Sequence, residues 1–242
     1  MQPLIVHPVP PFSFSLTAAI FSRGDPGFRW YDREAFRHAL CIGDRPVLVE
    51  VRSLGTVNEP RLAVTVHPTV VVTAALRNAV VSAVECIFST RDDSLPFYRA
   101  METDPVMADL VRQLRGLRAP TTPTVFEALA DSVIEQQISL RAAQAIEYRL
   151  IHAVGTKLAK GEATFSCYPT PRVLADTPDH VFRACGLTTR KGEYLRGISR
   201  LIISGDFDPE ALRAEPDTET IIRELVKIRG IGRWTAELTL LR

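Results

Sequence analysis

The spacing of apolar residues changes along the chain, and this change restricts the fold more than any other feature. Up to about residue 68, apolar residues occur in short β-branched runs such as VLVEVRSL and RLAVTVHP, with Gly55, Asn58 and Pro60 between these two. After Arg91 such runs end, and apolar residues recur every three or four positions. The first pattern is typical of an antiparallel hairpin and the second of amphipathic helices. The sequence therefore predicts an α+β protein, with a small antiparallel sheet and helices first and an all-helical part second.

Three further elements are predicted before residue 90. The segment PFSFSLTAAIF at 11–21 alternates large and small residues, which favours a strand. The segment DREAFRHALCI at 32–42 places its apolar residues on one helical face, with Asp32 as a suitable N-cap. From about Thr69 to Phe88 the chain contains neither Gly nor Pro and is apolar around most of a helix, which predicts a core helix packed on the sheet.

The rest of the chain divides at a Pro/Thr-rich stretch. The segment RAPTTPT at 118–124 has the composition of a linker, so we predict domains at 1–90, 91–118 and 119–242. Helices are expected from Asp104 with Pro105 at its first turn, from the capping box Thr124 to Glu127, and from Ser139 to Gly155. Three more are expected at 178–185, 190–204 and 218–227.

Composition excludes several classes of protein. The chain has 29 Lys and Arg against 28 Asp and Glu, for a formal charge of +1, so binding to nucleic acid would need a local site. The four cysteines are scattered without a C-x-x-C pair, which indicates reduced thiols. With no apolar run long enough to cross a bilayer and no signal peptide at the start, we expect a cytoplasmic protein.

The segment ELVKIRGIGRWTAELTLL at 224–241 is the most specific one. A helix is interrupted at Gly230-Ile231-Gly232 and a second helix begins at Arg233, with Ile231 as the apolar plug. This pattern predicts a helix-hairpin-helix, in which glycines let a phosphate approach and the first N–H groups of the second helix donate to it. Arg229 and Arg233 flank the turn and would add positive charge. An ordinary helix end followed by a new helix remains the alternative.

Three segments together resemble a known family. The strings GIGRWTAE, VIEQQIS at 133–139 and YPTP at 168–171 are similar to those of helix-hairpin-helix DNA glycosylases of the 3-methyladenine DNA glycosylase II type. The similarity covers most of 119–242, and PPFSFSLTAAIF resembles the opening strand of that family. It implies a monomeric enzyme that flips an alkylated purine from duplex DNA into a pocket between two domains and hydrolyses its N-glycosidic bond. It also implies neither an organic cofactor nor an iron–sulfur cluster.

The resemblance assigns roles to individual residues. DNA contacts fall on Arg229, Gly230, Ile231, Gly232, Arg233 and Thr235, and the wedge that fills the gap left by the flipped base falls on Gln137, beside Gln136. The carbonyls of Val226, Ile228 and Ile231 match a monovalent cation site. Trp234 matches an aromatic pocket residue, whereas Leu238 and Ile20 stand where some members have aromatics. Since bifunctional relatives carry Lys at the Trp234 position, the resemblance implies a monofunctional glycosylase. A plain core aromatic is the alternative for Trp234, and a helix cap for Gln137.

The resemblance places the catalytic aspartate about twenty residues beyond the hairpin, past Arg242, so no residue of 1–242 is assigned this role. Three explanations compete: a truncated chain, a natural fragment, and a non-catalytic DNA-binding protein or damage sensor. A purely structural interaction module is a further class. Glu237, Asp206 and Asp208 are the carboxylates nearest the hairpin or in loops, but such positions are common for surface residues.

Overall fold

The computed structural model describes residues 2–68 and 73–242. The chain divides into two compact units, Met1–Thr121 and Thr122–Arg242. The predicted α+β class is confirmed, with a sheet in the first unit and mainly helices in the second. The boundary between the units falls in the Pro/Thr-rich stretch, and residues 91–118, predicted as a separate segment, lie within the first unit.

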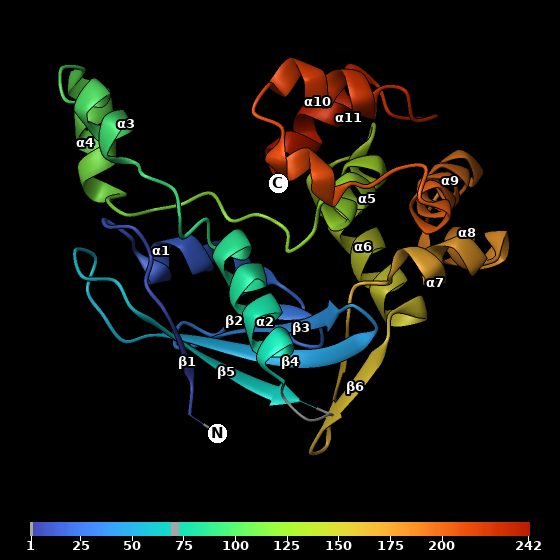
Figure 1. Cartoon of the computed structure of the whole chain (residues 1–242), viewed down its shortest axis with the longest axis horizontal. Coiled ribbons are helices and arrows are strands. Elements are labelled where there is room, and N and C mark those ends of the chain that lie inside the picture. The colour runs from blue at the N-terminus through green and yellow to red at the C-terminus, as the bar shows by residue number, and fades with distance from the viewer. Residues whose placement is uncertain (1, 69–72) are drawn as a thin grey trace. The chain divides into compact units, whose positions relative to one another are not determined.

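The first unit contains a five-stranded antiparallel sheet in the order β1-β5-β4-β3-β2. Helix α2 lies along this sheet (Figure 1) and contributes Val80 and Val84 to a core shared with Val49 and Val64. Among its described residues, the elements are β1 Leu4–Val6, α1 Phe14–Ala18, the 3₁₀ helix η1 Ala19–Arg23, β2 Arg29–Tyr31, β3 Phe36–Ile42, β4 Arg45–Ser53, β5 Leu62–Pro68, α2 Ala74–Ile87, α3 Leu95–Met101 and α4 Pro105–Gln113.

The predicted hairpin is confirmed by β4 and β5, which pair antiparallel from Val47↔Pro68 to Ser53↔Leu62. The predicted core helix is confirmed over α2, although 69–72, where it was expected to begin, lie outside the described residues. Asp104 caps α4 by accepting from the N–H groups of Val106 and Met107.

Two predictions for the first unit are wrong. Residues 36–42 form β3 rather than a helix, because pairing with β4 outweighs a helical pattern that burial on a sheet also satisfies. Asp32 still caps backbone N–H groups, those of Glu34 and Ala35, but in a turn that leads into the strand. Residues 14–23 form α1 and η1 rather than a strand, since Ser13 accepts from the Leu16 N–H and begins a helix there.

Arg118 connects the segment after α4 to the rest of the first unit. Its side chain is buried, and Nη2 donates to the carbonyls of Val9 at 3.1 Å and Asp92 at 3.0 Å. These bonds explain why residues 91–118 belong with the sheet: the buried guanidinium joins the main chain near β1 to the main chain just before α3.

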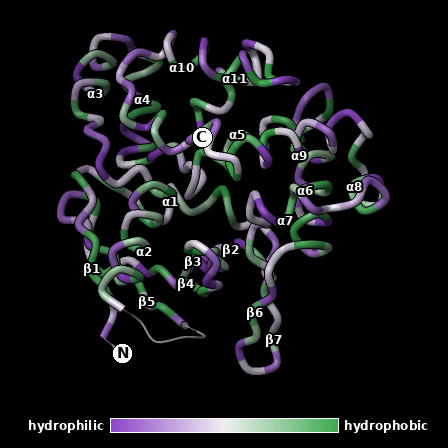
Figure 2. The backbone as a smooth tube through the Cα atoms, turned by 45° about the vertical axis from the view of Figure 1, so that its right-hand side comes forward, coloured by the Kyte–Doolittle hydropathy of each residue, from purple (hydrophilic) through white to green (hydrophobic). Residues whose placement is uncertain are grey.

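The second unit is built around α5, Val125–Glu135, whose residues from Phe126 to Ile134 are all buried. Figure 2 colours the course of α5 largely as hydrophobic, in keeping with a central helix. The other helices are α6 Leu140–Val154, α7 Pro171–Asp176, α8 Asp179–Cys185, α9 Thr189–Ser204, the 3₁₀ helix η2 Glu210–Ala214, α10 Thr218–Leu225 and α11 Arg233–Leu240. Of these, α6, α9, η2 and α11 pack against α5.

The caps predicted for this unit are confirmed. Thr124 accepts from the Glu127 N–H at 3.1 Å and Ser139 from the Ala142 N–H at 3.3 Å. The unit is not entirely helical, however, because β6 Lys157–Lys160 and β7 Ala163–Ser166 form a hairpin turned by Gly161. Figure 2 shows this hairpin as an arm extending from the helices. Within the described residues, no helix is both long and apolar enough to cross a membrane.

Candidate nucleic-acid interface

The predicted helix-hairpin-helix consists of α10, the turn 226–232 and α11. Gly230 has φ +94°, and a Cβ built there would lie 2.4 Å from Cγ of Tyr194. Only glycine fits both the conformation and the space. Ile231 is buried as the expected plug, and its N–H donates to the Ile228 carbonyl at 3.0 Å.

The end of the turn is open. Gly232 is exposed, occupies the N-cap position of α11 and supplies no side-chain cap, and a Cβ placed on it would meet nothing within 4 Å. Because the first N–H groups of a helix lack intrahelical partners and lie at the positive end of its dipole, this end of α11 is suited to bind an anion. The geometry is that required for contact between backbone amides and a phosphate.

The second predicted DNA-contacting element is the turn between α5 and α6. Gln137 is exposed and has φ +59°, an uncommon conformation for a residue other than glycine. The neighbouring Gln136 points the other way: its Nε2 donates to the Gly230 carbonyl at 2.9 Å and to Thr235 Oγ1 at 3.0 Å. The structure therefore brings this turn and the hairpin together and holds them through Gln136, while Gln137 remains exposed.

Lys191 on α9 supports the same turn from inside. Its Nζ donates to the carbonyls of Ile134 and Gln136, both at 2.7 Å, and the residue is 9% exposed. Burial lowers the pKa of Lys191 from its usual value. A cation is favourable here because the carbonyls at the C-terminal end of α5 carry the negative end of the helix dipole.

The two arginines of the hairpin are both paired with carboxylates. Arg229 Nη2 lies 3.1 Å from Glu193 Oε2, and Arg233 is held between Glu219 at 3.1 Å and Glu237 at 2.8 Å. Hydrogen bonds to these two carboxylates raise the pKa of Arg233. All of these groups are on the surface, so each pair is weak. The local positive charge expected from Arg229 and Arg233 is therefore largely balanced in the free protein.

The predicted base-pocket residues divide between the two units. Trp234, in the first turn of α11, is 55% exposed, and Leu238 follows one turn later on the same face, half-buried. This exposure speaks against the alternative that Trp234 is a plain core aromatic. Ile20 lies in η1 of the first unit and is 67% exposed, so its place in the same pocket stays a prediction.

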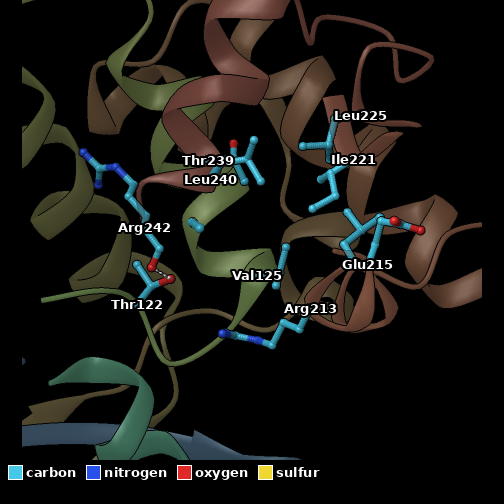
Figure 3. Close-up of a pocket in the computed structure, with 11 residues that line it drawn as sticks. Thr122, Val125, Arg213, Glu215, Ile221, Leu225, Thr239, Leu240 and Arg242 are labelled. Carbon is cyan, nitrogen blue, oxygen red and sulfur yellow. Dashed lines mark hydrogen bonds between the residues drawn. The ribbon is translucent and has the colours of Figure 1, made fainter. Parts of the chain in front are cut away.

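A cavity of about 310 Å³ lies at the start of α5, the end of that helix away from the turn at Gln137 (Figure 3). It is formed by the start of α5, η2, α10 and the end of α11, and the Thr122 N–H donates to the Arg242 carbonyl at its edge, at 2.7 Å. Trp234 and Leu238 are not among its lining residues. This cavity is therefore distinct from the predicted base pocket.

The carboxylates considered from the sequence all have structural partners. Glu237 is paired with Arg233, Asp206 accepts from Ser204 Oγ at 2.7 Å, and Asp208 accepts from the Glu210 N–H at 3.1 Å. A buried carboxylate that the sequence did not reveal is Asp131 on α5. It accepts from the Tyr168 hydroxyl at 2.8 Å.

The carbonyls of the turn were predicted to hold a monovalent cation. Main-chain oxygens at Val226, Ile228 and Ile231 are the type of ligand that such ions accept, and the Ile231 N–H occupies one of the two lone pairs of the Ile228 oxygen. The cation site therefore stays a prediction. For a metal held by side chains, residues 2–68 and 73–242 contain no group of three or more His, Cys, Asp or Glu arranged to bind one.

The hairpin and the α5–α6 turn both lie in the part of the chain that is similar to known proteins. Residues 130–239 match the family model described as HhH-GPD superfamily base excision DNA repair protein. A DNA-3-methyladenine glycosylase of Bacillus subtilis is 33% identical over 167 residues, which cover 69% of this chain and 54% of the relative. DNA-3-methyladenine glycosylase 1 of Schizosaccharomyces pombe is 31% identical over a region that covers 56% of this chain and 55% of the relative. The chain thus spans about half the length of the curated relatives it matches.

The fold agrees over nearly the whole chain. A 3-methyladenine DNA-glycosylase structure from Archaeoglobus fulgidus superimposes with a TM-score of 0.82 at 24% identity, covering 98% of this chain and 78% of the other. The second half of the chain thus matches the HhH-GPD superfamily of base excision DNA repair proteins over residues 130–239, and the chain is similar in sequence to DNA-3-methyladenine glycosylases.

Proposed function

We propose that this protein is a monofunctional DNA glycosylase that hydrolyses the N-glycosidic bond of alkylated purines, of the 3-methyladenine type, in duplex DNA. The names of the curated relatives support the activity and substrate class, and Trp234 in place of a lysine supports hydrolysis without strand cleavage. We further propose that it acts as a cytoplasmic, nucleoid-associated monomer.

One observation carries the proposal. The open N-terminus of α11 and the exposed Gln137 turn lie side by side, joined by the hydrogen bonds of Gln136 to Gly230 and Thr235. In this arrangement, amides at Gly232 and Arg233 bind a phosphate while Gln137 enters the stack beside the flipped base. Thr235 is buried and serves through Gln136 rather than by direct contact.

The proposed reaction requires few functional groups from the protein. An alkylated purine carries positive charge and leaves readily, so the enzyme must hold the base, stabilise an oxocarbenium-like sugar with a carboxylate and admit water. Trp234, exposed beside the hairpin, is suited to stack on the cationic ring, with Leu238 and Ile20 as further wall residues. The reaction needs no organic cofactor or iron–sulfur cluster. A Na⁺ or K⁺ ion at the carbonyls of the hairpin would stiffen the turn.

A second candidate is a non-catalytic DNA-binding protein or damage sensor. It is favoured by one observation: Glu237, the carboxylate one turn from Trp234, is engaged by Arg233. The two candidates agree on DNA binding and differ in turnover.

The test combines binding and excision. We expect chain 1–242 to bind a duplex with an abasic analogue about tenfold more tightly than an undamaged one, as fluorescence anisotropy would measure. Trp234→Ala should abolish most of this preference and leave affinity for undamaged duplex and thermal stability nearly unchanged, because the side chain is exposed.

Leu241→Ala is the matched control, an exposed apolar residue at the other end of α11, and it should leave the preference intact. Equal affinity for abasic and undamaged duplexes would contradict the glycosylase and the damage sensor and leave a DNA-binding protein without preference for damage. Release of methylated purines, measured by chromatography of the free base, distinguishes them: release by this chain or by a C-terminally extended form supports the glycosylase, and release by neither supports the sensor.

A further inference from the structure

Lys191 is a buried cation for which the proposed chemistry has no use. It projects from α9 to the end of α5, where its Nζ donates to the carbonyls of Ile134 and Gln136. Removing an ammonium group from water is costly, and a hydrophobic side chain of similar length would fill the same space without that cost. The cation therefore does something at this turn that packing alone would not.

Its effect falls on Gln137. The carbonyl of Gln136 belongs to the peptide that leads into Gln137, which has φ +59°. This left-handed conformation is unfavourable for a residue with a side chain and persists only where its surroundings hold it. A donor that grips the preceding carbonyl fixes the orientation of that peptide, and thereby the direction in which the Gln137 side chain leaves the surface.

The same peptide is tied to the hairpin. The side chain of Gln136 donates to the Gly230 carbonyl and to Thr235 Oγ1, while its main-chain carbonyl accepts from Lys191. Lys191, Gln136 and Gly230 thus form one chain of hydrogen bonds from α9 to the phosphate-binding turn. This series of hydrogen bonds fixes the position of Gln137 relative to the hairpin.

We propose that Lys191 is a positioning residue that holds the Gln137 turn in its DNA-entering conformation, in register with the hairpin. This inference rests on the proposed function, since it assumes that Gln137 enters the base stack. If Lys191 has this role, DNA affinity and distortion of the base stack depend on different residues. Affinity for DNA depends mainly on the amides at Gly232, whereas distortion of the base stack depends on Lys191 acting through Gln137.

The experiment uses a duplex with an abasic analogue and 2-aminopurine as its neighbouring base. Entry of a side chain into the stack raises 2-aminopurine fluorescence, and at saturating protein the signal does not depend on affinity. Gln137→Ala gives the signal without the wedge. Lys191→Met is expected to lower the increase about tenfold, towards the Gln137→Ala level, with a smaller change in affinity for the same duplex.

The matched control is Arg196→Met. Arg196 lies on the same helix α9, is mostly buried, and donates to a main-chain carbonyl, that of Thr177 at 2.9 Å, away from the turn. It should lose stability but keep the fluorescence signal. Lys191→Gln, which retains one amide donor, is expected to give an intermediate signal and serves if the Met variant fails to fold.

Each outcome decides a separate claim. Signals in the order wild type, Lys191→Gln, Lys191→Met, with Arg196→Met equal to wild type, support the positioning role. A wild-type signal in both Lys191 variants, or an equal loss in Arg196→Met, overturns it. If wild type binds the abasic duplex but gives no more fluorescence than Gln137→Ala, the wedge assignment and this inference fail together, and if wild type does not bind, the proposed function fails.

Discussion

His38 on β3 is buried against two aromatic rings with neither ring nitrogen hydrogen-bonded in the described structure. The rings of Phe28 and Phe36 meet it edge-on at 4.9 and 5.8 Å. Burial, with a smaller effect from the charge of Arg29, holds the pKa of His38 well below its usual value. The folded protein therefore keeps this imidazole neutral under conditions in which the unfolded chain takes up a proton.

The lowered pKa of His38 makes the folded protein less stable at acidic pH. Below about pH 6.5 the unfolded state binds a proton that the folded state does not, so the free energy of unfolding falls by about 1.4 kcal/mol per pH unit until the lowered pKa is reached. We expect His38→Leu to remove this component and to leave stability above pH 7.5 equal or higher. Urea denaturation at a series of pH values measures it.

His180, exposed in the second unit, provides the control. His180→Leu should keep the wild-type loss of stability between pH 6.5 and 5. If His38→Leu loses as much stability over this range as wild type, another group titrates there and His38 is not the cause.

The hairpin contains two glycines that are equivalent in the sequence motif but differ in backbone conformation and in the space around them. Gly230 has φ +94° and Tyr194 against it, whereas Gly232 has φ −91° and open space around it. Gly230→Ala should lower the free energy of unfolding by more than about 2 kcal/mol, through strain and collision. Gly232→Ala should leave stability within about 1 kcal/mol of wild type but weaken binding to every duplex, because its methyl group lies where a phosphate would approach.

Thermal unfolding and anisotropy titrations with damaged and undamaged duplexes measure the two effects. The hairpin assignment would be contradicted by unchanged DNA affinity in a folded Gly232→Ala protein. Tyr194→Ala combined with Gly230→Ala should recover the part of the loss that comes from the collision, and the part due to φ should remain.

Local signals predicted the elements whose ends are fixed by local chemistry. Thr124, Ser139 and Asp104 each cap the helix expected of them, and the turn after Ser53 joins β4 to β5. One failure is a segment decided by pairing at a distance. Phe36–Ile42 satisfies a helical period and a buried strand equally well, and its pairing with β4 selects the strand.

In the candidate site, too, local motifs were predicted and partners distant in the sequence were not. The glycine turn and the exposed positions of Gln137 and Trp234 agree with expectation from the motif. The partners that fix them could not be predicted, because Lys191 and Tyr194 lie some forty residues before the hairpin, on α9. One signal was available: Lys191 shares a helical face with Leu195 and Ile198, and a lysine in an apolar stripe indicates a buried partner.

At the scale of the whole molecule, charge is nearly balanced and DNA binding has to come from geometry. The formal charge is +1, and the arginines beside the hairpin turn face Glu193, Glu219 and Glu237. Proteins that neutralise many phosphates with Lys and Arg lose affinity steeply with salt, whereas amide donors release few counterions. We therefore expect log K against log salt concentration to have a slope of about −2 to −3.

Glu219→Gln tests the cause of this shallow slope. It removes one of the carboxylates that compete with phosphate for Arg233, so binding should tighten at low salt and the slope should steepen by about one unit. Glu162→Gln, in the β6–β7 turn, makes the same change in net charge away from the hairpin and should have a much smaller effect. Anisotropy titrations at several salt concentrations give both slopes. A wild-type slope of about −6 or steeper, or equal effects of the two substitutions, would show that overall charge rather than the amide end of α11 dominates binding.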